Sequence, residues 1–176
     1  MPPIDRQIEF LPNGAIKLKG ATEEPLKVGD PAPDFTLAGT DGEFVSLSDQ
    51  TGKAVLMVLV ADVTEGSFRE DYLKGFSEFV GTLPVGRVTP LVVSGSPYTA
   101  NQKAAQRIGN PDLLIVDDNF NQVVLDTYSI PDTHSTLIAI DETGIVRHIE
   151  NTSYPEENMF SDKRQATISR ALGTPV

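Results

Sequence analysis

The chain has 176 residues, and its 25 acidic and 14 basic side chains give a formal net charge of −11. This balance argues against nucleic acid or an anionic membrane as the main partner, because both require clustered Lys and Arg. The chain has no cysteine, which excludes disulfides, thiolate chemistry and cysteine-ligated metals. It has only two histidines, which argues against a metal site built from histidines. No apolar run has the roughly 18 residues of a membrane span, and no signal peptide is recognisable. We therefore expect a single cytoplasmic domain over residues 1–176, without a metal or cofactor.

The first predicted element is a β-hairpin over residues 7–18, QIEFLPNGAIKL. Asn13-Gly14 is typical of a type I′ turn, and apolar residues alternate on both sides of it. A loop rich in proline and glycine follows, and its composition favours an extended conformation over a helix. Two short strands are then predicted at 34–37 and 43–47, joined by a Thr-Asp-Gly turn.

The central segment combines a buried strand with a helix. Residues 54–60, AVLMVLV, are an unbroken apolar run, which suits a strand that is covered on both faces of a sheet. After a tight turn, aromatic residues recur at helical spacing, and they predict a helix from about Ser67 to Val80. A helix N-terminus at the end of a central strand stabilises negative charge, so this turn is the candidate site.

The rest of the chain continues the alternation of strands and helices and closes with a hairpin and a helix. The predicted strands are 87–93, 113–117, 135–141 and 145–150, and the predicted helices are 98–108, a short turn within 119–128, and 157–172 with Met159, Ala166, Ile168 and Leu172 facing inward. Two parallel crossovers followed by an antiparallel hairpin and a helix predict an α/β, thioredoxin-like fold with an N-terminal β-hairpin.

The segments VGDPAPDFTL (28–37), SGSPYTANQKAAQRIG and LIAIDETGIV resemble the peroxiredoxin family of the AhpC/TSA type. Together with the N-terminal hairpin they are most similar to the bacterial atypical two-cysteine thiol peroxidases, over roughly residues 7 to 172. The resemblance implies a peroxiredoxin-type thioredoxin fold, an antioxidant redox activity and a homodimer that forms across the turn region.

The residues that carry the chemistry of that family are mostly replaced. Its Pro-x-x-x-Thr-x-x-Cys motif reads here from Val60, in place of the proline, through Thr64 to Ser67, in place of the peroxidatic cysteine. His134 or Ser135 stands near the position of the family's arginine, and no resolving cysteine is present at 101–105. The candidate catalytic residues are therefore Ser67 and Thr64.

This pattern leaves two functional hypotheses. Serine has neither the acidity nor the oxidation chemistry of a thiol, so the first is a pseudoenzyme, a non-catalytic homologue with a binding or stress-related role. Its Thr64–Ser67 turn would bind a small polar or anionic ligand through backbone N–H groups. The alternative is an antioxidant thiol peroxidase that reduces hydroperoxides and is seen here as a cysteine-to-serine variant at position 67.

Structural interpretations compete with these hypotheses. Ser67 and Glu70 match a Ser-x-x-Glu capping box, in which the serine only caps the helix. A serine hydrolase would need a base and an acid, and His134 has no visible acid partner. The Asp117-Asp118 pair is interpreted as a solvated loop in preference to a cation site.

Overall fold

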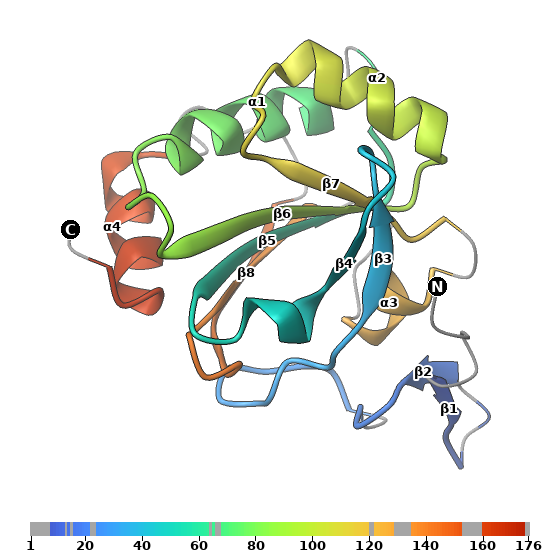
Figure 1. Ribbon diagram of the computed structural model, residues 1–176. Coiled ribbons are helices and arrows are strands. Elements are labelled where there is room, and N and C mark those ends of the chain that lie inside the picture. Colours follow the sequence, from blue (N-terminus) through green and yellow to red (C-terminus); the bar gives the residue numbers. More distant parts are fainter. Residues whose placement is uncertain are drawn as a thin grey trace.

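The computed structural model describes residues 8–12, 14, 16–21, 24–63, 65, 68–119, 122–128, 135–152 and 160–174, with Phe68 and Thr152 described by their backbone alone. It contains a two-stranded hairpin and a seven-stranded sheet in the order β4-β3-β7-β6-β5-β8-β9 (Figure 1). The strands are β1 (Ile8–Phe10), β2 (Ile16–Leu18), β3 (Thr36–Gly39), β4 (Phe44–Ser46), β5 (Ala54–Val60), β6 (Val88–Ser94), β7 (Leu114–Asp117), β8 (Ser135–Ile140) and β9 (Val146–Thr152). The helices are η2 (Leu47–Gln50), α1 (Phe68–Val80), α2 (Tyr98–Ile108), α3 (Val123–Thr127) and α4 (Asp162–Ala171).

Strand β5 is the centre of the sheet. It pairs in parallel with β6 and antiparallel with β8, and β6 pairs in parallel with β7. Every residue of β5 is buried, the most accessible being Ala54 at 5%. The continuous apolar run is explained by this position, since a strand covered on both faces has no solvent side that requires polar residues. The predicted α/β fold of thioredoxin type is confirmed.

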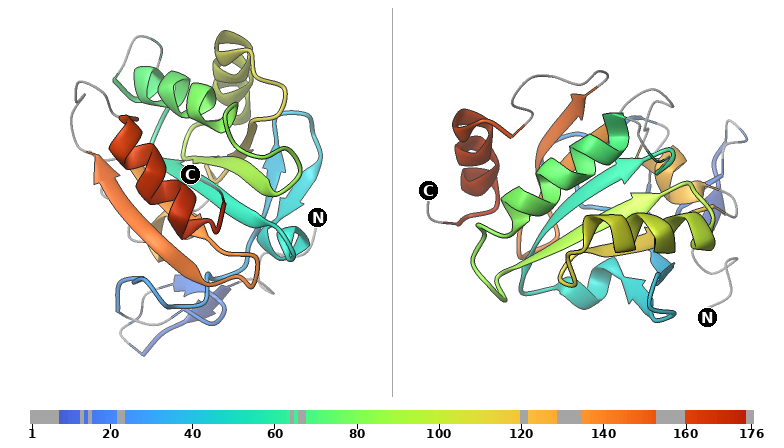
Figure 2. Two further views of the ribbon diagram at one scale, coloured as in Figure 1. Left: turned by 90° about the vertical axis from the view of Figure 1, so that its left-hand side faces the viewer. Right: turned by 90° about the horizontal axis from the view of Figure 1, so that it is seen from above.

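The two faces of the sheet have different covers. Leu56, Val58 and Val60 belong to a core that includes residues of α1, α2 and α4, whereas Met57 and Leu59 belong to a core that includes residues of α3. Figure 2 shows α1 and α2 crossing one face of the sheet with α4 beside them. Helix α1 therefore lies over the strand that precedes it. No helix in the described segments has the length and apolar character that a membrane crossing requires.

The N-terminal hairpin is confirmed, with Ile8 opposite Leu18 and Phe10 opposite Ile16. Its turn differs from the predicted type I′. The backbone N–H of Gly14 donates to the carbonyl of Leu11 at 2.8 Å, so Pro12 occupies the first central position. Proline fixes φ near −65°, and a type I′ turn needs a positive φ at that position. Asn13 lies outside the described residues.

The C-terminal helix is shorter than predicted. Helix α4 begins at Asp162, five residues after the predicted start, and the hydroxyl of Ser161 accepts a hydrogen bond from the backbone N–H of Arg164 at 3.4 Å. A serine that caps a helix fixes its first turn, and this signal was missed in the sequence. Ile168 and Leu172 are buried as predicted, Ala166 is half-buried, and Met159 lies outside the described residues.

Candidate functional site

The candidate site lies at the edge of the sheet where β5 and β6 end and β8 begins. Val60 pairs with Ser94 on one side and Ser135 on the other. The two predicted catalytic residues, Thr64 and Ser67, lie outside the described residues, as does His134. The structure describes the residues on both sides of the turn, Asp62 and Val63 before it and the start of α1 after it, and these define its frame.

The chain entering the turn is bound to the loop between β6 and α2. The backbone N–H of Val63 donates to the hydroxyl of Ser96 at 3.1 Å, and the backbone N–H of Ser96 donates to the hydroxyl of Ser94 at 3.0 Å. Both serines are buried. The SGSP segment therefore supplies hydroxyl groups that hold the backbone at the entry to the turn.

Gly95 allows this loop to lie directly against the end of β5. Its backbone N–H donates to the carbonyl of Val60 at 3.0 Å. A Cβ atom at this position would lie 2.5 Å from the carbonyl oxygen of Ala61, a distance shorter than any van der Waals contact allows. Glycine is thus required by the close approach of two backbones rather than by an unusual φ angle.

A buried carboxylate joins the first turn of α1 to the end of α2. Glu70 is 6% exposed, and its Oε1 accepts a hydrogen bond from Nε of Arg107 at 2.8 Å and lies 3.7 Å from Nζ of Lys74. The Nη2 of Arg107 also donates to the carbonyl of Val63 at 3.2 Å. Arg107 thereby connects both sides of the turn. The predicted capping box with Ser67 stays a prediction, since Ser67 is not described.

A second ion pair crosses the turn, between Nη1 of Arg69 and Oδ2 of Asp62 at 2.5 Å. Together with the pair between Arg107 and Glu70, it means that both guanidinium groups described near the turn have a carboxylate partner. A thiolate-stabilising site needs an arginine whose charge is available to the anion. The described arginines at this site are instead used to hold the turn.

Two buried polar side chains at this edge keep hydrogen-bonding capacity. Ser135 is fully buried, and its Oγ has no hydrogen-bond partner among the described residues. Because it pairs directly with Val60, it shares the sheet face over which α1 lies. Asn101 is also fully buried; its Nδ2 donates to the carbonyl of Ser96 at 3.1 Å, while its Oδ1 has no partner in the described part of the chain. An unsatisfied buried polar atom costs about 1 to 3 kcal/mol and marks a position where a ligand group or water gains free energy.

Asp118 corrects the interpretation of the Asp117-Asp118 pair as a solvated loop. It is 5% exposed, and its Oδ2 accepts a hydrogen bond from the backbone N–H of Leu125 at 2.8 Å, at the start of α3. Burial raises the pKa of this carboxyl from 3.8 to about 7, against the opposing effect of its backbone hydrogen bonds. Asp118 is thus a buried cap for α3. No group of three or more His, Asp or Glu residues within the described ranges has the arrangement of a metal site.

The Redoxin family profile matches residues 27–174, which is most of the chain. The chain belongs to the redoxin family. Its predicted resemblance to peroxiredoxins is thereby confirmed, whereas the placement of Val60 and Ser67 at the positions of the family's proline and cysteine stays a prediction.

Similar proteins carry peroxiredoxin names. Peroxiredoxin Q of Triticum aestivum chloroplasts is 28% identical over 76% of this chain, and the match covers 63% of that protein's length, less than two thirds. Among solved structures, a peroxiredoxin-like protein from Aquifex aeolicus has a TM-score of 0.71 at 16% identity and covers 94% of this chain and 98% of its own. A thiol peroxidase from Chromobacterium violaceum has a TM-score of 0.69 at 14% identity, with coverage of 89% and 92%. At these identities the two structures establish the fold.

The buried carboxylate of Glu70 generates the first test. Arg107→Ala leaves Glu70 in a buried position without its main partner, so we expect the free energy of unfolding to fall by about 2 to 4 kcal/mol. Urea unfolding measures this change. Adding Glu70→Gln to Arg107→Ala removes the buried charge that has lost its arginine and should restore at least about 1 kcal/mol.

The matched control for this test is Arg147→Ala. Arg147 forms a more exposed pair with Asp141, its side chain being 48% accessible, so its loss should cost at most about 1 kcal/mol. An equal cost for Arg107→Ala and Arg147→Ala would contradict the role given to Glu70.

The raised pKa of Asp118 generates a pH test. Because its folded pKa of about 7 exceeds the ordinary value of 3.8, the folded state binds the additional proton between these values, and stability falls as the pH rises through 7. Between about pH 5 and 8 the parent should lose about 2 to 3 kcal/mol relative to Asp118→Asn, whose amide oxygen still accepts the Leu125 hydrogen bond. Urea unfolding of both proteins at the two pH values measures the difference, and a constant difference would refute the assignment.

Proposed function

We propose that this chain is a non-catalytic member of the redoxin family, a pseudoenzyme that uses the peroxiredoxin scaffold in a binding or stress-related role. The observation that carries the proposal is the serine at position 67 in a chain without any cysteine, on a fold that keeps the central strand β5 and the helix α1 of a redoxin-family chain. The scaffold is retained and the reacting group is replaced.

The replacement removes the chemistry for a physical reason. Reduction of a hydroperoxide needs a thiolate that attacks the O–O bond and is oxidised to a sulfenic acid. A serine hydroxyl is far less acidic than a thiol, and the dipole of a helix N-terminus contributes at most about 2 kcal/mol to stabilising an anion. The nearest described guanidinium groups, on Arg69 and Arg107, already have carboxylate partners. Serine 67 therefore has no means of becoming an equivalent nucleophile.

The ligand we propose is a small polar or anionic molecule at the Thr64–Ser67 turn. The start of the 13-residue helix α1 offers backbone N–H groups to such a ligand. The buried Oγ of Ser135 and Oδ1 of Asn101 support a polar site at the same edge of the sheet, since each has unused hydrogen-bonding capacity among the described residues.

We also propose that the chain forms a homodimer across this region. Light scattering coupled to size-exclusion chromatography tests this proposal.

The second candidate function is an antioxidant thiol peroxidase whose cysteine has been replaced at position 67. Membership of the redoxin family and the peroxiredoxin names of the relatives favour it. The replacement of the family's arginine and proline positions favours the first proposal, because a single substitution would have left both unchanged. The codon at position 67 of the source gene separates the two: serine supports the pseudoenzyme, and cysteine supports the peroxidase.

Hydroperoxide consumption in the presence of a thiol reductant tests the proposal. We expect no turnover by the parent above the uncatalysed rate. Ser67→Cys should react no more than about tenfold faster than an ordinary thiol, because thiolate formation alone sets its reactivity. Ser48→Cys is the matched reference for such a thiol, because Ser48 is exposed and lies outside the turn. A rate for Ser67→Cys several orders of magnitude above Ser48→Cys would show that the peroxidase machinery is intact.

A further inference from the structure

A hollow lies at the opposite edge of the sheet from the candidate site. It has a volume of about 760 Å³ and is formed by the amino end of β5, the loop before β6, the turn between β8 and β9, and the end of α4. Its volume falls within the range of roughly 300 to 1,000 Å³ that is typical of small-molecule sites. The seven residues of β5 separate the two edges by about 20 Å, so this hollow is distinct from the turn.

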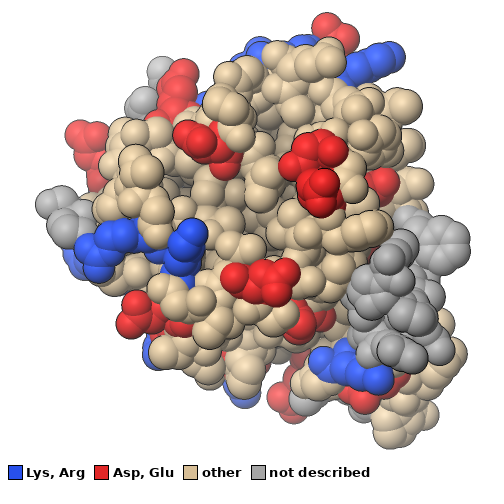
Figure 3. Space-filling view, in the orientation of Figure 1, with Lys and Arg blue, Asp and Glu red and all other residues tan. Residues whose placement is uncertain are grey.

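Three arginines from three different elements line the hollow: Arg87 before β6, Arg147 on β9 and Arg170 on α4. Figure 3 shows basic side chains gathered over this part of the surface. The remaining arginines of the described chain, at 69, 107 and 164, are each paired with a carboxylate. Within the described ranges, Arg87 and Arg170 form no ion pair with a carboxylate. Their two guanidinium groups line the hollow and can therefore bind an anion there.

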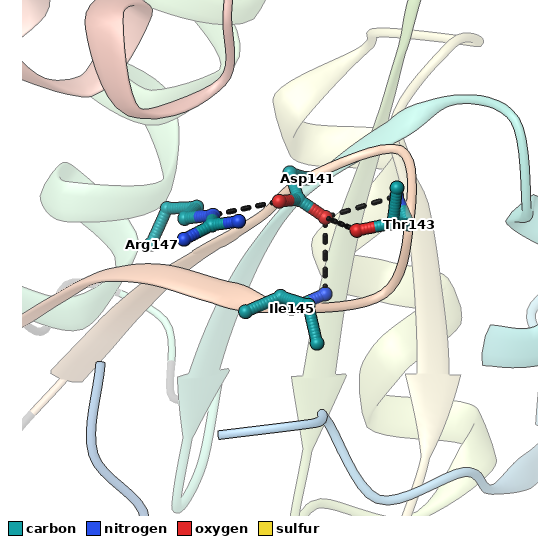
Figure 4. A network of polar contacts seen from close by, with 4 residues as sticks. All are labelled: Asp141, Thr143, Ile145 and Arg147. Atoms are coloured by element: carbon teal, nitrogen blue, oxygen red, sulfur yellow. Dashed lines mark hydrogen bonds and ion pairs between the residues drawn. The ribbon is translucent and has the colours of Figure 1, made fainter. Parts of the chain in front are cut away.

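Two acidic residues also line the hollow, Asp141 and Glu142, and Asp141 already accepts several hydrogen bonds. Oδ1 of Asp141 accepts hydrogen bonds from the hydroxyl of Thr143 at 2.6 Å and from the backbone N–H of Ile145 at 3.1 Å, and its Oδ2 accepts from Nε of Arg147 at 2.6 Å (Figure 4). Burial alone would raise the pKa of Asp141, but these bonds lower it to about 2. Asp141 therefore holds Arg147 by its Nε, and the two Nη groups of Arg147 remain for another acceptor.

We propose that this arginine-lined hollow binds a small multivalent oxyanion, an organic phosphate or a polycarboxylate. Guanidinium groups bind both phosphoryl and carboxylate oxygens in a bidentate manner. Ala54, Ala171 and Leu172 supply apolar surface for the organic part of such a ligand. The net charge of −11 repels anions from the molecule as a whole, but in this hollow three arginines outnumber the two carboxylates, Asp141 and Glu142. The site does not depend on the function proposed for the turn.

The test is isothermal titration calorimetry of the full chain with tripolyphosphate and with citrate, which separate the phosphate source from the carboxylate source. We expect saturable binding of at least one of them with one site per chain. Arg87→Gln and Arg170→Gln should each weaken that binding by about tenfold or more, the usual effect of losing a charge-assisted hydrogen bond. Lys163→Gln is the matched control, because it removes an equal charge from an exposed position on the same helix α4 and does not line the hollow.

Urea unfolding of each variant shows whether a loss of binding is a loss of folding. Both arginines are exposed, so their replacement should leave the urea midpoint unchanged. Absence of saturable binding of both anions to the parent overturns the proposal. An equal weakening by Lys163→Gln also overturns it, because that result would indicate a general charge effect and not a site.

Discussion

The burial of β5 is the constraint on which the rest of the structure depends. Its seven residues pair with β6 on one side and β8 on the other, and both faces are covered. No part of the strand can shift without breaking two ladders and two cores. This fixes the point at which the chain leaves the sheet after Val60, and the N–H of Gly95, bonded to the carbonyl of Val60, fixes the neighbouring loop against it.

The residues on both sides of the turn that follows are joined by polar contacts that stabilise the fold. Arg107 bridges Glu70 and the carbonyl of Val63, Arg69 pairs with Asp62, and Ser96 holds the N–H of Val63. In a thiol peroxidase an arginine at such a site stabilises a thiolate, but here the described guanidinium charges are balanced by carboxylates. The scaffold and its polar frame are therefore compatible with the binding role that we propose.

Most of the fold could be predicted because its signals are local. The run 54–60 and the helical spacing after it are properties of adjacent residues, and the observed β5 matches its predicted bounds. The pairing of Glu70 with Arg107 joins residues 37 positions apart, so no local pattern indicates it. Asp118 was misinterpreted for a similar reason: an acidic pair after a strand is usually solvated, and the packing of α3 that buries it is tertiary. Of the candidate site, the frame is now established, whereas the roles of Thr64 and Ser67 stay predictions.

The thiol pKa of Ser67→Cys, measured from thiolate absorbance as a function of pH, tests the central claim most directly. If Arg69 and Arg107 stay in their ion pairs with Asp62 and Glu70, only the helix N-terminus stabilises the thiolate. The thiol pKa should then lie at about 8, close to that of a free thiol. A pKa well below about 7 would show that the site still stabilises a thiolate, and it would contradict the account of a scaffold that has kept its frame and lost its reactive machinery.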